Sequence, residues 1–327
     1  MPTPKKWGSN PTLPDPKSFA PGSHVWLDGK VVPATDVKLG LLTHTLHYGF
    51  GVFEGMRAYQ QADGTSAIFR LREHIQRLLD GARILHIHVP FSLDQISQGC
   101  LDVLVHSRMP DAYLRPLLFI GEGRMGIYAP DNPVRVTVPV WKWGSYLGVE
   151  GQQHGIRTKI STFTRVGVNM NMPRGKVVGH YVNSILAKQE AIADGYEEAI
   201  LLDDQGYCAE GSGENLFMVR HGTLVTPPLS APILAGITRD SALTLARELG
   251  IPVAEEMFSR SDLYLADEAF FTGTAAEITP IREVDGRTVG EGRPGPITRR
   301  IMDRFFKVLR GEVRDHGEWR TVYRIER

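Results

Sequence analysis

The chain has 327 residues, and hydrophobic residues make up 42% of it. This length allows a buried core larger than one domain usually holds, so we expect two domains. Lysine plus arginine and aspartate plus glutamate both number 37, which gives a formal net charge of zero. A chain without a basic excess is a poor candidate for binding nucleic acid or an anionic membrane.

The two cysteines and the first residues indicate the setting of the protein. Cys100 and Cys208 match no metal or redox spacing, which favours two reduced thiols and a cytoplasmic location. Residues 1–21 are rich in proline and have no apolar run behind a basic start. They predict an extended arm rather than a secretory signal. No apolar run approaches the length of a membrane span.

The first half of the chain predicts strands with two helices between them. In chain order we expect a hairpin around Asp28-Gly29, a strand, two helices and two strands, at 24–32, 67–70, 71–85, 93–107, 112–120 and 133–140. The helix over 71–85 rests on an apolar stripe formed by Leu71, Ile75, Leu78, Leu79 and Ala82. The glycine-rich residues 144–152 predict a linker between two domains.

The second half repeats the alternation of strands and helices. The expected strands lie at 156–163, 198–203, 207–210, 215–219, 223–226 and 268–272, and the expected helices at 181–194 and 238–249. No strict strand-helix-strand rhythm appears, so we expect an α/β or α+β fold of two domains with mixed or antiparallel sheets. The predicted division is an arm 1–21, a small domain 22–143, a linker 144–152 and a large domain 153–327.

Familiar catalytic motifs are absent from the sequence. It contains no G-x-S-x-G elbow, P-loop or dinucleotide fingerprint. The histidines do not bring carboxylates or cysteines at ligand spacing, so we expect no metal site.

Lys176 and Glu210 stand in glycine-rich surroundings. Lys176 lies in MPRGKVVGHYVNS; a single lysine is most often a solvated charge. The alternative is a Schiff-base lysine, which needs small neighbours for a planar ring and a lowered pKa. Glu210 opens EGSGEN, which is often only a turn. A carboxylate there could instead lie beside a pyridinium nitrogen and keep it protonated.

Two threonines follow glycines at places that suit a phosphate. Thr238 lies at the start of the helix in GITRDSALTLARELG, where exposed amides attract anions. The ordinary alternative is a threonine N-cap. Thr274 follows Gly273 in FFTGTAAEITP, at the end of a predicted strand. Together with Lys176 and Glu210, these features indicate a phosphorylated aldehyde cofactor, although each has an ordinary structural explanation alone.

A long ordered series of motifs resembles the branched-chain aminotransferases of pyridoxal-phosphate (PLP) fold type IV. The matching segments are HTLHYGFGVFEGMRAY (44–59), FRLREHIQRL (69–78), YLRPLLFIG (113–121), NSILAKQEA (183–191), DGYEEAILLD (194–203), EGSGENLF (210–217), PILAGITRDS (232–241), LYLADEAFFTGTAAEITPI (263–281) and VGEGRPGPIT (289–298). The resemblance implies a PLP enzyme with its active site at the interface of two domains, the larger of which binds PLP.

The resemblance also implies cofactor contacts. Lys176 would be the Schiff-base lysine and proton shuttle, Tyr181 would contact the ring hydroxyl, and Glu210 would face the ring nitrogen. Leu234 would pack on the ring. The phosphate would be held by Arg77, Ile237, Thr238, Gly273 and Thr274. The helix stripe puts Arg77 opposite the apolar face, so by pattern alone Arg77 is an exposed arginine.

The implied substrate contacts fall into three groups. An apolar pocket, partly from a second subunit, would come from Tyr48, Phe53, Ile127, Trp143 and Tyr146. Tyr113, Thr274 and Ala275 would hold the α-carboxylate. Arg115, and after it Arg57, would receive the second carboxylate of glutamate.

The resemblance therefore implies a transaminase that moves amino groups between branched-chain L-amino acids and 2-oxoglutarate, as a homodimer or a multiple of dimers. Alternatives of the same fold are a D-amino-acid or R-amine transaminase and an aminodeoxychorismate lyase. A non-catalytic PLP carrier predicts loss of the lysine, the glutamate or the threonines, and all are present.

Overall fold

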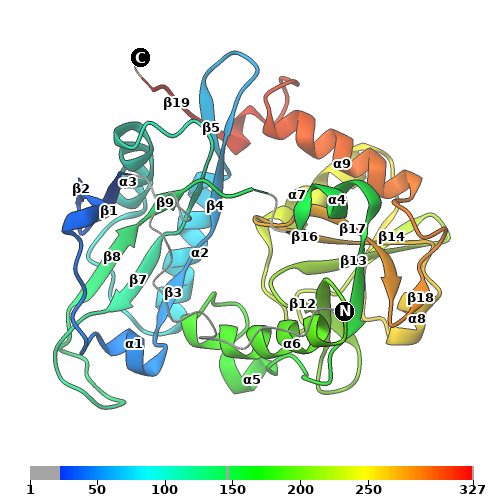
Figure 1. Cartoon of the computed structure of the whole chain (residues 1–327), viewed down its shortest axis with the longest axis horizontal. Coiled ribbons are helices and arrows are strands. Elements are labelled where there is room, and N and C mark those ends of the chain that lie inside the picture. The colour runs from blue at the N-terminus through cyan, green and yellow to red at the C-terminus, as the bar shows by residue number, and fades with distance from the viewer. Residues whose placement is uncertain (1–22, 145–146, 326–327) are drawn as a thin grey trace. The chain divides into compact units, whose positions relative to one another are not determined.

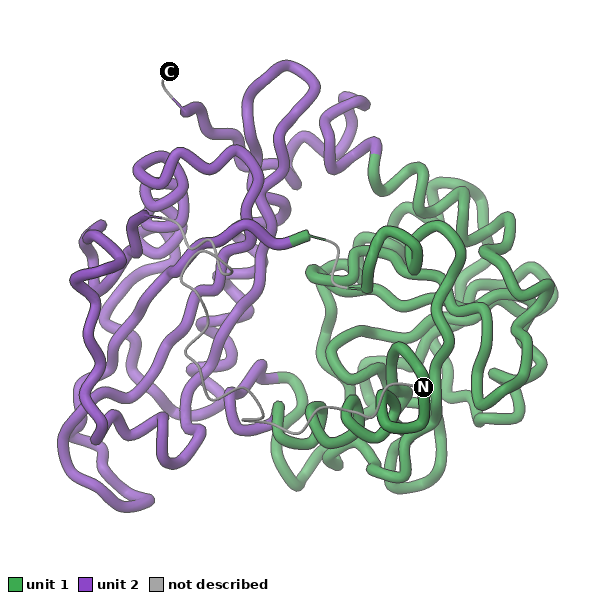
Figure 2. The backbone as a smooth tube through the Cα atoms, viewed as in Figure 1, with its two compact units in different colours: residues 1–13, 144–174, 181–306 green, residues 14–143, 175–180, 307–327 purple. Residues whose placement is uncertain are grey.

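The computed structural model describes residues 23–144 and 147–325 (Figure 1). It divides into two compact units, coloured separately in Figure 2. Unit 1 holds the described part of Gly144–Arg174 and Tyr181–Phe306, and unit 2 holds 23–143, Gly175–His180 and 307–325. The predicted arm lies outside the described residues, and the predicted domain ranges stay a prediction. Unit 2 takes in the short piece that carries Lys176.

Unit 2 contains, within the described ranges, two five-stranded antiparallel sheets, in the orders β2-β1-β8-β7-β3 and β19-β5-β4-β6-β9. The strands are β1 (His24–Leu27), β2 (Lys30–Pro33), β3 (Gly51–Phe53), β4 (Met56–Gln60), β5 (Ser66–Phe69), β6 (Ala112–Leu114), β7 (Leu117–Ile120), β8 (Val134–Val138), β9 (Val140–Trp141) and β19 (Arg320–Tyr323). The predicted hairpin is confirmed: Asp28 and Gly29 have φ of 47° and 91°, as a tight turn between β1 and β2 requires.

Helices cover the sheets of unit 2. They are α1 (His44–Tyr48), α2 (Leu71–Ile84) and α3 (Leu93–His106). The predicted stripe of α2 is confirmed, because Ile75 and Leu78 are buried in one core with Val103 of α3 and Leu118 of β7. A capping box at Ser92 starts α3 by satisfying its first amides.

Two predicted strands are each broken at a proline. Residues 112–120 form β6 and β7 in different sheets, with Pro116 between them, and 133–140 form β8 and β9 on either side of Pro139. Proline has no N–H to donate to the ladder, which favours a break of the strand at Pro116 and at Pro139. Arg115 N donates to Pro139 O at 3.0 Å across this corner. Arg115 therefore lies at a corner between sheets and not within a strand.

Unit 1 is built on a mixed sheet, as expected. Within the described residues, nine strands run in the order β12-β11-β10-β17-β16-β13-β14-β15, with β18 on β17 and a further pairing of β12 with β13. The strands are β10 (Ile156–Ile160), β11 (Glu198–Leu202), β12 (Cys208–Gly211), β13 (Asn215–Arg220), β14 (Thr223–Thr226), β15 (Val253–Glu255), β16 (Glu268–Gly273), β17 (Glu277–Val284) and β18 (Arg287–Thr288). The β12–β13 pairing brings Glu210 opposite Asn215.

Four of the helices that the structure describes in unit 1 were not predicted from the sequence. The helices are α4 (Gly148–His154), α5 (Val168–Asn171), α6 (Tyr181–Ala193), α7 (Ile237–Glu248), α8 (Arg260–Tyr264) and α9 (Pro296–Leu309), the last of which ends in unit 2. The helix α4 begins in the stretch predicted as a linker and ends two residues beyond it, and α9 begins within the last quoted motif. The predicted helices over 181–194 and 238–249 are confirmed as α6 and α7.

Candidate active site

Lys176 lies in the short piece Gly175–His180 that belongs to unit 2. This piece runs against β3: Phe53 N donates to the Lys176 carbonyl at 3.0 Å, and Val52 and Val177 form an antiparallel bridge. Lys176 Nζ lies 5.1 Å from the centre of the Phe53 ring. Backbone pairing therefore places Lys176 beside Phe53.

Glycines allow the lysine segment to approach the chain before β3 closely. Gly179 N donates to Gly49 O at 3.0 Å. A Cβ on Gly49 would lie 2.9 Å from the Gly179 Cα, and Gly49 has a φ of 65°. Any side chain at Gly49 would push the two segments apart. Lys176 therefore has small neighbours on this side.

Three aromatic rings lie around the Arg115 guanidinium. Its Cζ is 4.7 Å from the ring centre of Phe53, 5.3 Å from that of Tyr113 and 5.7 Å from that of Trp141. Trp143 packs edge-on against Tyr113, with ring centres 4.6 Å apart. The sequence analysis missed Trp141, although its two-residue spacing from Trp143 is the spacing of neighbours on one strand face.

Arg115 keeps hydrogen-bonding capacity inside this cluster. Its Nη2 donates to the Tyr113 hydroxyl at 3.3 Å, while its buried Nε has no hydrogen-bond partner among the described residues. Gly55 makes room for that hydroxyl, because a Cβ there would lie 1.9 Å from it. Arg57 pairs with Tyr113 across β4 and β6, and its Nη1 donates to Trp143 O at 3.3 Å. The Arg115 guanidinium lies against aromatic rings and has an N–H donor, Nε, without a partner among the described residues, so it is suited to bind an anion.

Arg77 is not the exposed arginine that the helix pattern predicts. Its side chain is only 13% exposed and forms a bidentate pair with Glu54, with Nε–Oε1 at 2.6 Å and Nη2–Oε2 at 2.9 Å. Glu54 directly follows β3, and its side chain is completely buried. The helix pattern shows which face is apolar but not what packs beside the other residues, so the prediction of exposure was wrong.

Glu210 is a carboxylate of unit 1 that is held by three partners. It lies in β12 and is buried. One oxygen is 2.7 Å from Arg165 Nε, and the other accepts from Asn215 Nδ2 and from Leu234 N, both at 3.1 Å. A cation and two donors stabilise an ionised carboxylate. The sequence analysis missed Arg165, which no motif marks, and Asn215, which closes EGSGEN.

The N-terminus of α7 has no side-chain cap. Gly236 is its N-cap residue, so the alternative in which Thr238 is the N-cap is wrong. A Cβ on Gly236 would lie 1.8 Å from Asn215 Oδ1, so this position must be glycine. Ile237 and Thr238 open the helix and are both buried. The N-cap residue therefore offers no side-chain oxygen to the first amides of α7, and a helix start of this kind is suited to bind an anion.

The end of β16 lies beside the Glu210 strands. Thr272 pairs with Asn215 across β16 and β13, and α7 packs on β16. Thr272 is buried, and its Oγ1 has no hydrogen-bond partner in the part of the chain that the structure describes. Gly273 ends the strand, and Thr274 and Ala275 follow in the turn to β17. Unit 1 thus brings the predicted ring and phosphate residues of its own segments together.

The remaining predicted residues lie elsewhere. Tyr181 is the first residue of α6 and is half-buried. Tyr48 ends α1, and its hydroxyl accepts from Gly126 N at 3.1 Å. Ile127, which follows Gly126 in the sequence, is 93% exposed. Tyr48 and Ile127 are therefore neighbours on the surface of unit 2, while Tyr146 lies outside the described residues.

A protein-family model matches most of this chain. The model for amino-transferase class IV matches residues 51–284, a range that includes Phe53, Lys176, Glu210 and Thr274. This chain belongs to the class IV aminotransferases. The family resemblance and the fold class inferred from the sequence are thereby confirmed.

Relatives of this class IV aminotransferase are named for one activity. The branched-chain-amino-acid aminotransferase of Pseudomonas aeruginosa is 48% identical over 298 residues, which cover 91% of this chain and 96% of the relative. The crystal structure of the Escherichia coli branched-chain amino acid aminotransferase matches with a TM-score of 0.89 at 45% identity, covering 91% of this chain and 98% of that one.

A third relative was solved with two ligands. The T.th. branched-chain amino acid aminotransferase, complexed with N-(5'-phosphopyridoxyl)-L-glutamate, matches with a TM-score of 0.87 at 40% identity. The same enzyme complexed with 4-methylvaleric acid matches with a TM-score of 0.86 at 39% identity. Each match covers 92% of this chain and 98% of that one.

A second buried glutamate, Glu214, lies in the same segment of this aminotransferase. Burial, and then the nearby Glu198 charge, raise the pKa of Glu214 to about 8. Lys188 compensates Glu198 directly, with Nζ 2.6 Å from its carboxylate. Glu214 is therefore mostly protonated at neutral pH.

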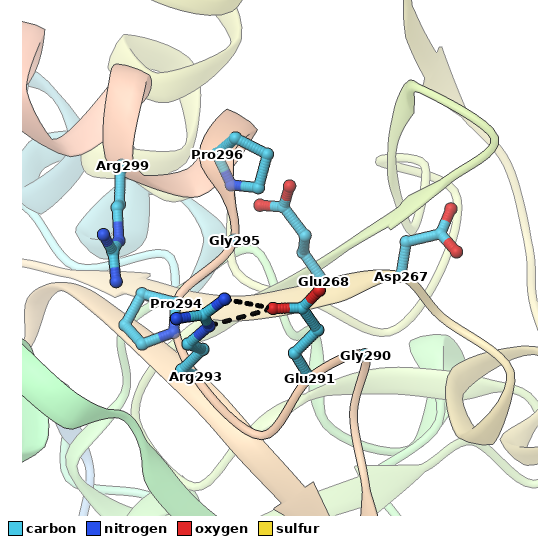
Figure 3. A pocket seen from close by; sticks show the side chains of 9 residues that line it. All are labelled: Asp267, Glu268, Gly290, Glu291, Arg293, Pro294, Gly295, Pro296 and Arg299. Carbon is cyan, nitrogen blue, oxygen red and sulfur yellow. Dashed lines mark hydrogen bonds and ion pairs between the residues drawn. The ribbon is translucent and has the colours of Figure 1, made fainter.

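A pocket of about 620 Å³ in unit 1 contains none of the predicted site residues (Figure 3). It is lined by Asp267, Glu268, Gly290, Glu291, Arg293, Pro294, Gly295, Pro296 and Arg299. The Glu268 carboxylate already accepts from Ile297 N at 3.0 Å and from Thr298 N at 2.7 Å, which caps α9. Arg293 is paired with Glu291. The last quoted motif, residues 289–298, thus contains the start of α9, where Glu268 caps the first amides.

Other kinds of site find no support in the described part of the aminotransferase. No group of three or more histidines, cysteines, aspartates or glutamates there could hold a metal ion. No helix in the described ranges is long and apolar enough to span a bilayer. Cys100 and Cys208 are free and buried, and burial raises the pKa of both thiols, that of Cys208 to about 12. Both thiols are therefore weak nucleophiles.

Proposed function

We propose that this aminotransferase exchanges amino groups between L-leucine, L-isoleucine or L-valine and 2-oxoglutarate, with pyridoxal 5'-phosphate as its cofactor. The observation that carries the proposal is the aromatic cluster around Arg115, in a chain that matches branched-chain aminotransferases over 91% of its length. The reaction would serve the synthesis of the three amino acids in the cytoplasm. The two free, buried thiols agree with a reducing compartment.

The Arg115 cluster accounts for two unlike substrates. The rings of Phe53, Tyr113 and Trp143 offer apolar surface to an isobutyl group, as Tyr48, Ile127 and Tyr146 would. The planar guanidinium of Arg115 can bind the second carboxylate of glutamate in a bidentate manner, and it can stay on the rings when leucine is bound. Arg57 is the second candidate for this contact. The T.th. relative was solved with both a glutamate adduct and a branched apolar acid, which supports this division.

The residues of the chain fit the cofactor. The uncapped start of α7, with Thr238, is suited to a phosphate, and Gly273, Thr274 and Arg77 are assigned to the same group. Thr272, which precedes Gly273 in β16, has a buried Oγ1 without a hydrogen-bond partner among the described residues. When bound, PLP supplies an aldehyde that receives the amino group and a ring that takes up electron density from the substrate α-carbon.

Each protein group has a defined task in the reaction. With PLP bound, Glu210 would accept the ring N–H, Leu234 would pack on the ring face, and Tyr181 would hydrogen-bond the ring hydroxyl oxygen. Lys176 Nζ would hold the cofactor aldehyde, and with the amino acid bound it would move the proton of the α-carbon. The α-carboxylate is bound by Tyr113, Thr274 and Ala275.

Other activities of the fold share the lysine and the glutamate but need different substrate groups. A D-amino-acid or R-amine transaminase presents its substrate in the opposite hand, and an aminodeoxychorismate lyase has no use for an apolar pocket shared with Arg115. A panel of amino donors of both hands, offered with 2-oxoglutarate, decides among these activities.

We also propose that the enzyme is an obligate homodimer or a multiple of it. Apolar side chains cluster on unit 2 at Leu41, Leu46, Ile127 and Tyr128, which are 87%, 65%, 93% and 80% exposed. An exposed apolar surface of this kind usually meets another chain. Light scattering at assay concentration should give a dimer or a multiple of dimers, and a fully active monomer would contradict the proposal.

A further inference from the structure

Glu54 is a completely buried carboxylate with three partners. Arg77 binds both of its oxygens, at 2.6 and 2.9 Å, and His74 Nδ1 lies 2.7 Å from Oε2. Gly55 N donates to the same oxygen at 3.1 Å. An isolated buried charge is very costly, so a carboxylate persists here only because cation and donors compensate it.

The charges in this group are well defined. Burial alone would raise the pKa of Glu54, but Arg77 and His74 lower it well below its usual range. Burial, together with the charges of Arg77 and Lys176, lowers the pKa of His74 despite the neighbouring Glu54, so the imidazole is neutral at pH 7 and Nδ1–H donates to the carboxylate. Glu54 is therefore ionised, and it holds Arg77 through a planar two-point contact.

Glu54 also lies where three functional segments meet in unit 2. Its neighbour Phe53 donates from its backbone to the Lys176 carbonyl at 3.0 Å. Glu54 N donates to Pro116 O at 2.7 Å, directly after Arg115. The side chain reaches α2, where His74 and Arg77 lie three residues apart on one face. The backbone of Glu54 therefore lies near Lys176 and Arg115, and its side chain holds Arg77.

We propose that Glu54, braced by His74, is a positioning residue that orients Arg77 toward the cofactor phosphate. The inference rests on the proposed function, which assigns Arg77 to that phosphate. A guanidinium has five N–H groups in a fixed fork, so one arginine can bind a carboxylate and a phosphate oxygen together. The fork also fixes the plane of the guanidinium, which lysine could not do.

The test compares PLP with pyridoxal, which lacks the phosphate. The cofactor is removed from the intact enzyme, and rebinding of each compound is titrated by absorbance and tryptophan fluorescence. Glu54→Gln should weaken PLP binding by roughly 10- to 100-fold, the effect of a charge-assisted hydrogen bond, and leave pyridoxal binding little changed. An equal loss for both compounds, or no loss, overturns the proposal, because a purely structural ion pair cannot discriminate between them.

Two further variants separate the possible failures. Arg77→Ala should show the same selective loss, and Glu54→Gln should add no phosphate-selective loss in that background. If Arg77→Ala is not selective, the assignment of Arg77 to the phosphate fails, and the inference fails with it. If Arg77→Ala is selective but Glu54→Gln is not, or if the two losses add, only the role of Glu54 fails.

The matched control lies on the same helix. Arg70 Nε and Glu73 Oε1 are 2.7 Å apart, as close as the Glu54 pair, but the Glu73 side chain is 39% exposed. Glu73→Gln should leave the ratio of PLP to pyridoxal affinity unchanged. If Glu54→Gln yields no folded protein, Glu54→Asp takes its place, because it retains the charge and withdraws it by one methylene. It should weaken PLP binding selectively over pyridoxal binding, and it should add no selective loss to Arg77→Ala.

Discussion

Replacing Glu210 by glutamine should leave the cofactor bound and slow both half-reactions by about 100-fold or more, as the loss of a preorganised charge in a buried site does. The side chain is buried, and Arg165, Asn215 and the Leu234 amide hold its oxygens in place. A glutamine amide carries no negative charge, so the ring nitrogen loses the partner that keeps it protonated. Single-turnover absorbance changes with leucine and with 2-oxoglutarate measure the two half-reactions.

Glu214→Gln is the matched control for this experiment. Glu214 stands in the same segment and is mostly protonated at neutral pH, so glutamine reproduces its shape and charge. Its half-reactions should stay close to those of the unmodified enzyme. Near-normal rates in Glu210→Gln would remove Glu210 from the ring nitrogen, and a similar loss in both variants would mean that the segment acts only through its fold.

Arg115→Ala should separate the two substrates. Glutamate brings a side-chain carboxylate to the cluster and leucine does not. Loss of a charge-assisted hydrogen bond of roughly 1.5–3 kcal/mol lowers efficiency by about 10- to 100-fold. We expect that loss in the half-reaction with glutamate and a much smaller one with leucine. Stopped-flow spectra of each half-reaction, recorded over a range of substrate concentrations, measure both.

Arg57→Ala is the comparison for the Arg115 variant. Arg57 lies across the sheet pairing from Tyr113 and donates to Trp143, so it belongs to the same cluster. If Arg57→Ala alone gives the glutamate-selective loss, the second carboxylate is bound by Arg57. If Arg115→Ala slows leucine and glutamate equally, Arg115 serves the α-carboxylate or the fold, and the account of dual specificity fails.

Local patterns were enough to predict most elements of the fold. The Asp28-Gly29 turn predicts a hairpin because its two residues accept positive φ. The apolar stripe over 71–85 shows which face of α2 packs against the core. The helix α9 could also have been predicted. Pro296 stands at its first position, and Ile301, Phe305 and Val308 are buried at helical spacing.

At Pro116 and Pro139 the strand pattern does not reveal which sheet each piece of the chain joins. The apolar residues continue on either side of each proline, so the sequence reads as one strand. Only the pairing of the pieces with different sheets shows that the chain turns a corner there. That corner positions Arg115 among rings from other segments, which is a tertiary property and leaves no local signal.

The predicted site shows the same division between local and tertiary information. Lys176 and Glu210 could be proposed from the sequence because the glycines around them are adjacent in sequence, and their roles stay predictions. Glu54 and Arg165 were not, because each acts on a partner from a separate segment, and a carboxylate or guanidinium carries no sign of its partner. For the same reason the exposure of Arg77 was predicted wrongly.

The most direct test of the proposed activity is a panel of amino donors offered with 2-oxoglutarate, with the glutamate formed as the readout. The panel contains L-leucine, L-isoleucine, L-valine, their D enantiomers, D-alanine and an R-amine. We predict that the three L-amino acids are the fastest donors, that the D-amino acids and the R-amine give no turnover above background, and that Lys176→Ala is inactive with every donor. A D-amino acid or R-amine that reacts as fast as L-leucine would contradict the assignment.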